Sequence, residues 1–213
     1  KRQKTIINMA PADIRKEGAA YDLTIAMGML AASGQMKSDK LSQYMIMGEL
    51  SLDGSLRPIK GVLPIAIKAK EEGFKGFFLP KQNANEAAIV SGLDVYGLEN
   101  VSEIIDFFEG RGDLKPTVFN TREEFYKTLD FPEFDFSDVK GQESIKRCME
   151  IAAAGGHNII LIGPPGAGKT MLAKRLPSIL PPMTLREALE TTKIHSVAGK
   201  MKNVGLLNQR PFR

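Results

Sequence analysis

The sequence predicts an α/β protein made of two domains. Strand-like and helix-like runs alternate over the first 112 residues, as they do when helices pack on a sheet. A second unit combines an apolar strand-like run, a glycine-rich loop and a helix at residues 157–179. Between the two, the periodicity fades. We therefore divide the 213 residues into a domain at 1–112, a linker at 113–139 and the start of a second domain at 140–213.

The elements expected in the first domain follow from periodicity and turn residues. The pair Asp53-Gly54 separates two apolar runs within residues 44–59 and predicts a hairpin, because both residues tolerate positive φ. A helix is expected at 19–34, buried on most sides and ended by Gly34. The other expected elements are a short strand that runs into a Pro/Asp turn within 5–13, strands at 76–80 and 93–98, and helices at 62–73, 83–92 and 101–110, the last starting at Ser102.

The linker mixes aromatic and acidic residues. Its carboxylates outnumber its basic side chains and would repel a nucleic acid, so we expect the aromatics to pack on neighbouring surface rather than to stack on bases. These aromatics are Phe119, Phe125, Phe131, Phe134 and Phe136.

Charge is distributed unevenly along the chain. Residues 1–139 hold 17 basic and 21 acidic side chains, whereas residues 140–213 hold 12 and 4. A basic excess favours polyanions, either nucleotide phosphates or a nucleic-acid backbone. A domain whose acidic half is missing from the sequence would give the same excess, and both interpretations stay open.

Composition indicates a soluble protein. No apolar run approaches the roughly 20 residues of a membrane span. The single cysteine, Cys148, has no partner for a disulfide, and the first residues do not resemble a signal peptide. We expect a cytoplasmic, reducing environment.

A phosphate-binding loop is the strongest local signal. The spacing G-x-x-x-x-G-K-[ST] is met between an apolar run and a helix, the context that this loop requires. Glycines let backbone N–H groups surround a phosphate, the lysine reaches the β- and γ-phosphates, and the threonine hydroxyl can ligate Mg²⁺. The sequence therefore predicts binding of ATP with Mg²⁺, the metal at Thr170, by Gly163, Pro164, Pro165, Gly166, Ala167, Gly168, Lys169 and Thr170.

Hydrolysis requires further groups that the sequence does not supply. An acidic residue should follow a second apolar strand, and an arginine should meet the γ-phosphate. After Lys169 the only acidic residues are Glu187 and Glu190, both within a helix-like run. We expect the chain to be a piece of a longer protein and to be inactive alone, with the catalytic acid and the arginine finger outside it.

Several long stretches resemble one family. GPPGAGKTMLAKRLPSILPPM, HSVAG and QRPFR are similar to Mg-chelatase-like AAA+ ATPases of the YifB/ComM type. NMAPADIRKEGAAYDLTIAMGMLAASGQ and GELSLDGSLRPIKGVLPIA resemble the family's N-terminal domain, which has a Lon-protease-like (ribosomal S5 domain 2-like) fold. The resemblance implies residues missing at both ends and a bacterial ATPase that forms a hexameric ring. It also implies a DNA branch-migration helicase linked to recombination or natural transformation.

The same resemblance raises the question of proteolysis. Lon-type sites use a serine nucleophile and a lysine base. Matching RKEGAAYD to the Lon pattern puts Ala20 at the nucleophile position, and the second stretch puts Leu63 near the lysine position, three residues after Lys60. An alanine cannot attack a carbonyl, so we expect no peptidase activity and a scaffold or platform role.

Other polar residues carry weaker expectations. His157, His195 and Cys148 lack metal-ligand spacing, so no metal site beyond nucleotide-bound Mg²⁺ is expected. Lys174 and Arg175 are expected on a solvated helix face, with a position facing phosphate or a neighbouring subunit as the alternative. The arginines of the last segment, Arg210 and Arg213, have no assigned role, although a DNA-facing or intersubunit position would suit them.

Three functional hypotheses remain. The first is an ATP-driven motor on branched or single-stranded DNA. The second is a Mg-chelatase-like ATPase that remodels a protein partner and has no DNA substrate. The third makes the N-terminal domain an interaction module by itself. Stimulation of ATP turnover by DNA and salt-sensitive DNA binding discriminate the first from the second.

Overall fold

The structure is a computed structural model that describes residues 4–8, 19–37, 39–127, 134–201, 205–208 and 210. It contains two compact units. The first comprises Lys1–Asn120 with Thr192–Gly205, and the second comprises Thr121–Thr191 with Leu206–Arg213. Each unit is considered separately, and the domain boundaries expected from composition stay a prediction.

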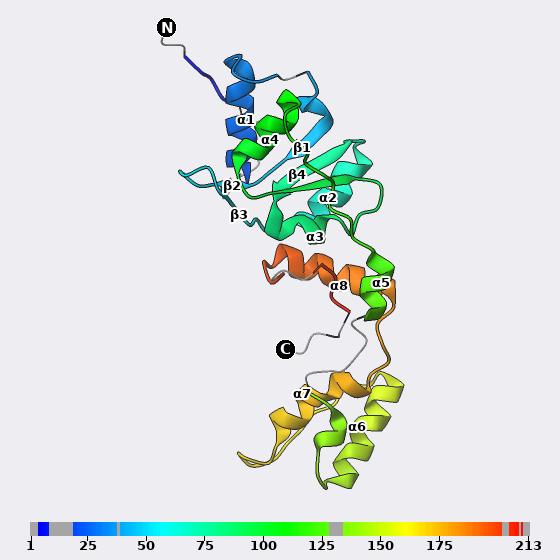
Figure 1. Ribbon diagram of the computed structural model, residues 1–213. Helices are drawn as coiled ribbons and strands as arrows, with labels where there is room; N and C mark the ends of the chain where they lie inside the picture. Colours follow the sequence, from blue (N-terminus) through cyan, green and yellow to red (C-terminus); the bar gives the residue numbers. More distant parts are fainter. Residues whose placement is uncertain are drawn as a thin grey trace. The chain divides into compact units, whose positions relative to one another are not determined.

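A three-stranded parallel sheet forms the centre of the first unit (Figure 1). Its order is β1-β4-β5, with β1 at Tyr44–Ile46, β4 at Gly76–Pro80 and β5 at Asp94–Leu98. All five residues of β4 are buried, as expected for the middle strand of a parallel sheet that is covered on both faces. The strands expected at 76–80 and 93–98 are therefore confirmed.

Helices cover both faces of this sheet. Phe77 and Leu79 of β4 pack with α2 (Val62–Glu71) and α3 (Ala84–Ala87). Phe78, which points to the opposite face, packs with α1 (Asp22–Ala32) and α4 (Val101–Glu109). The alternation of side chains along a strand thus builds two cores, and the predicted α/β class is confirmed.

The hairpin predicted at Asp53-Gly54 is present. Strands β2 (Glu49–Leu50) and β3 (Leu56–Arg57) pair antiparallel, and Gly54 has φ +85°. Only the second half of the expected apolar stretch forms this hairpin, because residues 44–46 pair in parallel with β4 instead.

Several element bounds differ from those expected. α4 begins at Val101, since Asn100 caps it and exchanges hydrogen bonds with Glu103 in a capping box. Helix formation in 83–92 is limited to α3, after a 3-10 turn at Lys81–Asn83. The remaining 3-10 turns of the first unit are Ala19–Tyr21 and Leu41–Gln43.

The beginning of the chain also departs from expectation. α1 is less buried than predicted: Leu23 and Met27 are its only buried residues, and Met29 is 46% exposed. Residues 5–8 form no strand, and 9–13 lie outside the described residues.

The second unit consists of helices around a small core. Its elements are α5 (Thr121–Lys127), a 3-10 turn at Phe136–Asp138, α6 (Glu143–Gly155), α7 (Lys169–Ile179) and the first part of α8 (Leu185–Val197). Phe136, Val139, Met149 and Leu172 form the core. The helix expected after the glycine-rich loop is confirmed as α7.

The strand expected at 157–163 is wrong for this structure. These residues form no strand, and Ile160 and Ile162 are 80% and 87% exposed. A strand exists only through hydrogen bonds to a neighbouring strand. None of the described residues of the second unit forms a strand that could pair with this segment.

Most linker aromatics pack, as expected. Phe125 and Phe136 are buried, and the ring of Phe119 lies against Gly205. Phe134 is 36% exposed and has the basic groups of Lys174 and Arg175 over its ring, while Phe131 lies outside the described residues. The segment is not wholly irregular, since it holds α5 and the turn at Phe136–Asp138.

Candidate nucleotide-binding site

The glycine-rich loop leads directly into α7. Gly166 and Gly168 have φ of +82° and +77°, backbone conformations that residues with a Cβ rarely adopt. Gly168 is the N-cap of α7, and its carbonyl accepts the first helical hydrogen bond from the Leu172 N–H at 2.9 Å. The two glycines thus let the chain turn sharply and enter the helix without a side chain over the loop.

Lys169 closes the loop on itself. Its ammonium group donates hydrogen bonds to the carbonyl of Gly163 at 2.8 Å and to the carbonyl of Pro164 at 2.7 Å. As the first residue of α7, Lys169 brings its charge back over the loop rather than into the core. An ammonium held by two carbonyls can exchange these acceptors for phosphate oxygens.

Thr170 and the loop backbone stand open to a ligand. Residues 163–167 and Thr170 are exposed, and Thr170 lies in the first turn of α7, where free N–H groups carry partial positive charge. The site therefore fits a triphosphate with Mg²⁺, because residues 163–170 combine exposed loop residues, the Lys169 ammonium and the Thr170 hydroxyl.

A hydrogen bond and an ion pair hold the turn at Phe136–Asp138 against α7. The Ser178 hydroxyl accepts a hydrogen bond from the Phe136 N–H at 2.9 Å. The guanidinium of Arg175 lies 3.4 Å from the Asp138 carboxylate and over the ring of Phe134, at 5.4 Å from its centroid. The solvated position expected for Arg175 is wrong, because its side chain is only 16% exposed; Lys174 is exposed. Nothing in the periodicity of α7 indicated this pairing.

The two acidic residues that follow Lys169 are engaged in local contacts on α8. Glu187 accepts hydrogen bonds from the backbone N–H and hydroxyl of Thr184, and these bonds, with help from Arg210, lower the pKa of its carboxyl group. Glu190 pairs with Arg186 at 3.3 Å. Both carboxylates thus stabilise the helix, and neither lies at the end of a strand.

The Lon-like positions of the first unit carry no catalytic pair. The Ala20 carbonyl accepts a hydrogen bond from the Gly48 N–H at 2.8 Å, and the Leu63 side chain is buried in the core. Lys60 is exposed. Residues 15–18 of the matched stretch lie outside the described residues, and the absence of peptidase activity stays a prediction.

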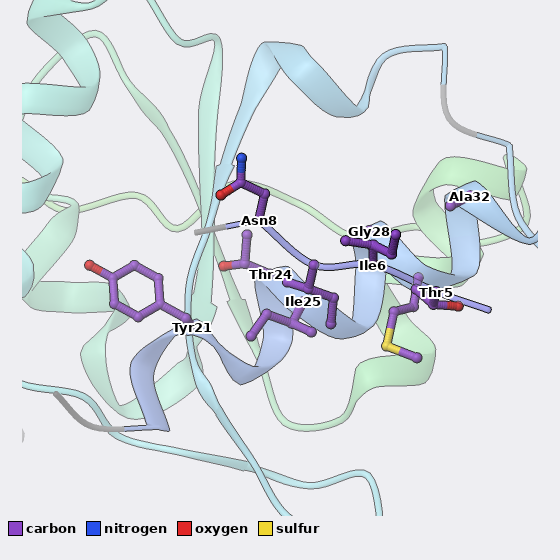
Figure 2. A pocket seen from close by; sticks show the side chains of 10 residues that line it. Thr5, Ile6, Asn8, Tyr21, Thr24, Ile25, Gly28 and Ala32 are labelled. Carbon is purple, nitrogen blue, oxygen red and sulfur yellow. The ribbon is translucent and has the colours of Figure 1, made fainter. Parts of the chain in front are cut away.

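An apolar pocket lies beside α1 in the first unit (Figure 2). Its volume is about 410 Å³, and residues 5–8 form one wall while α1 forms the other. Ile25, Gly28 and Ala32 line the helical wall, so the pocket follows the incompletely buried face of α1. The sequence does not predict this pocket, because its apolar residues predict a helix that is buried on most sides.

The remaining polar residues do not gather into a site. Among the described residues, no three His, Cys, Asp or Glu side chains cluster as metal ligands would. His157 and Cys148 are exposed. Arg210 donates to the Pro181 carbonyl and pairs with Glu187, whereas Arg213 lies outside the described residues. No helix in the described part of the chain could span a membrane.

Two family models match this chain. Residues 135–213 match the family described as magnesium chelatase, subunit ChlI, and residues 1–83 match the family described as subunit ChlI of Mg-chelatase. The chain is 41% identical over 211 residues to competence protein ComM of Haemophilus influenzae, covering 99% of this chain and 41% of that protein.

Two further relatives extend the comparison. Uncharacterized protein YifB of Escherichia coli is 42% identical over 214 residues, covering 99% of this chain and 40% of that protein. An archaeal Lon protease of Methanothermobacter thermautotrophicus is 35% identical over 82 residues, covering 38% of this chain and 13% of the protease. This likeness supports the Lon-like assignment of the first domain.

The chain spans about two fifths of the length of the curated relatives that it matches from end to end. Its parallel α/β unit agrees with a Lon-like domain, and its glycine-rich loop and helix agree with the family of AAA+ ATPases. The chain therefore belongs to the Mg-chelatase-like AAA+ family that includes ComM and YifB.

Proposed function

We propose that this protein is an ATP-driven motor that binds ATP and Mg²⁺ at residues 163–170. The observation that carries the proposal is the geometry of the loop: two glycines at positive φ, an exposed backbone and Lys169 at the start of α7. The loop amides and the Lys169 ammonium would hold the phosphates, and the Thr170 hydroxyl would supply a ligand to Mg²⁺. The bound metal supplies charge neutralisation at the phosphates.

The remaining catalytic groups come from outside this chain in our proposal. Glu187 and Glu190 are occupied by Thr184, Arg210 and Arg186, so neither is free to polarise a water. The acid and the arginine finger would be supplied by further residues of the protein or by the next subunit of a hexameric ring. The chain alone would therefore not turn over ATP.

We propose DNA as the substrate, in branched or single-stranded form. One relative is named a competence protein, and residues 140–213 carry 12 basic against 4 acidic side chains. A basic excess favours a polyanion and makes its binding sensitive to salt. We further propose a cytoplasmic location, no membrane partner, and no peptidase activity, since Ala20 stands where a nucleophile would be needed.

The test is ATP-dependent migration of a labelled four-way DNA junction by the natural, full-length protein. The wild type should resolve the junction, and the Lys169→Ala variant should not, because the triphosphate loses its ammonium partner. Lys174→Ala removes an exposed lysine from the same helix and should behave like the wild type. Unchanged ATP turnover without any junction migration would refute the DNA motor.

A second candidate is a protein-remodelling ATPase without a DNA substrate. The apolar pocket beside α1 favours it, because such a pocket suits an apolar side chain of a protein partner better than a phosphate backbone. A variant with Ile25→Glu in the pocket wall separates the candidates. Junction migration should survive this change if DNA is the substrate, whereas partner-stimulated ATP turnover should be lost if a protein is the substrate.

A further inference from the structure

The end of α8 belongs to the first unit although it follows the glycine-rich loop in sequence. Residues Thr192–Gly205 are part of that unit. The helix closes with a Schellman motif, in which the Gly199 N–H bonds the Ser196 carbonyl at 3.0 Å and the Lys200 N–H bonds the His195 carbonyl at 2.9 Å. Gly199 has φ +67°, as this ending requires. We call residues 192–200 the strap.

The strap meets the start of α2 end to end. The Gly61 N–H, at the N-cap of α2, donates a hydrogen bond to the Ser196 carbonyl at 3.0 Å. The first N–H groups of one helix and the last carbonyls of another are the groups that lack partners within their own helices. Their opposite partial charges attract, so this contact gives the Gly61 N–H a partner and brings a second donor to the Ser196 carbonyl, which also accepts from the Gly199 N–H.

A side chain reinforces the contact. A Cβ placed on Gly199 would lie 2.7 and 2.8 Å from two carbons of the Lys60 side chain. The aliphatic part of the Lys60 side chain therefore packs on the strap at Gly199, the strap residue that has no side chain. A cation near the carboxyl end of α8 has the favourable sign for the helix dipole.

The receiving surface is rigid. The Asn83 side chain accepts from the Ile59 N–H at 2.9 Å and donates to the Ile59 carbonyl at 3.0 Å. The Glu86 carboxylate accepts from the Leu63 N–H at 3.0 Å. Both side chains are buried, so Ile59 and Leu63 have hydrogen-bond partners that do not depend on the strap.

The strap, by contrast, is docked weakly. It buries the polar residues Thr192 and Ser196, and the Ser196 hydroxyl has no partner among the described residues. Ile194 and Val197, its larger apolar side chains, are 69% and 64% exposed. A buried hydroxyl without a partner opposes docking, and apolar side chains that remain exposed do not favour it. Such a contact suits an element that docks and releases.

We propose that the docking of this strap on the start of α2 is coupled to nucleotide binding at residues 163–170, with nucleotide favouring release. This inference rests on the proposed nucleotide site. α7 begins at Lys169, residues 180–184 connect α7 to α8, and Arg210 bonds both Pro181 and Glu187. The structure combines a docked strap with Lys169 held by loop carbonyls, so a phosphate that draws Lys169 away favours the alternative state.

Exchange of one amide hydrogen tests this coupling. The Gly61 N–H reports the docked strap directly, while the Leu63 N–H, held by Glu86, serves as an internal control two residues away. Hydrogen exchange at single-residue resolution is measured on the full-length protein with and without Mg²⁺ and the non-hydrolysable analogue AMP-PNP. Binding of AMP-PNP is measured in the same samples. We expect exchange at Gly61 to become about five-fold faster or more, with Leu63 unchanged.

A matched pair of variants tests the docking itself. Gly199→Ala, at the Lys60 contact, should speed exchange at Gly61 without nucleotide. Gly73→Ala imposes similar backbone strain at φ +79° in open space and should leave exchange at Gly61 unchanged. If AMP-PNP binds and Gly61 exchange stays constant or slows, the inference is wrong and the nucleotide site stands. If AMP-PNP does not bind, the proposed nucleotide site is wrong, and the inference that rests on it is wrong as well.

Discussion

The ammonium group of Lys169 lies 2.8 Å from the carbonyl oxygen of Gly163, six residues earlier in the chain. This hydrogen bond folds the lysine back over the glycine-rich loop. It stands at an exposed site, so breaking it exposes no core. The same ammonium can therefore leave the carbonyl for a phosphate oxygen at a small cost in free energy. We expect nucleotide binding to use this exchange of hydrogen-bond partners.

Thr170→Ala should remove the contribution of magnesium to nucleotide affinity. The hydroxyl is the group in the loop that suits Mg²⁺, and its loss should weaken binding of Mg·ATP about ten-fold, with little change in EDTA. Titration of a fluorescent ATP analogue, with and without the metal, measures both values. Thr170→Ser keeps the hydroxyl and should retain the magnesium effect. Equal affinities of the wild type and Thr170→Ala in Mg²⁺ would contradict the assignment.

Asn83→Ala should destabilise the first unit by about 1–3 kcal/mol, because the buried N–H and C=O of Ile59 both lose their partner. Urea unfolding followed by circular dichroism gives the free energy of unfolding. The neighbouring Gln82 is exposed, and Gln82→Ala should change stability by less than about 0.5 kcal/mol. Similar effects of the two substitutions would show that the Asn83 contacts do not stabilise the unit.

Phe78→Ala should cost about 3–5 kcal/mol of unfolding free energy. Phe78 is fully buried in the middle strand, and its ring stacks on Tyr96 with centroids 4.8 Å apart. Thermal unfolding measures the loss, with Leu52→Ala at the exposed hairpin tip as the control that should unfold like the wild type. A loss below about 1 kcal/mol would mean that the two-faced packing of β4 is wrong.

The Glu187 carboxyl should titrate below its ordinary pKa of 4.5, because the Thr184 backbone and side chain donate hydrogen bonds to the charged form. A depressed pKa adds stability above the unfolded value, and this stability is lost as the pH falls from about 4.5 through the folded value. Carbon NMR of the labelled carboxyl measures the titration. Thr184→Ala should move the pKa up, whereas Ser144→Ala on α6 should not. A Glu187 pKa at or above 4.5 in the wild type would contradict the hydrogen bonds from Thr184 to the Glu187 carboxylate.

The sequence predicted those parts of the fold that local chemistry determines. The hairpin at Gly54, the strand at 76–80 and the helix after the glycine-rich loop were expected because turn residues, apolar runs and glycines act over a few neighbours. The candidate site was predictable for the same reason, since all its groups lie within eight consecutive residues.

Features that depend on distant residues were missed. Residues 157–163 have the composition of a strand, yet a strand requires a paired neighbour. Arg175 was expected in solvent because its partners, Phe134 and Asp138, lie some 40 residues earlier. The contact of Ser196 with Gly61 joins residues even further apart, and no periodicity indicates it.

Equilibrium binding of Mg·ATP to the full-length protein and to its Lys169→Ala variant tests the central claim most directly. A fluorescent ATP analogue, titrated at fixed salt, should bind the wild type at least ten-fold more tightly than the variant, since a charge-assisted hydrogen bond contributes about 1.5–3 kcal/mol. Thermal unfolding of the variant should match the wild type. Equal affinities in two equally folded proteins would contradict the nucleotide site at residues 163–170.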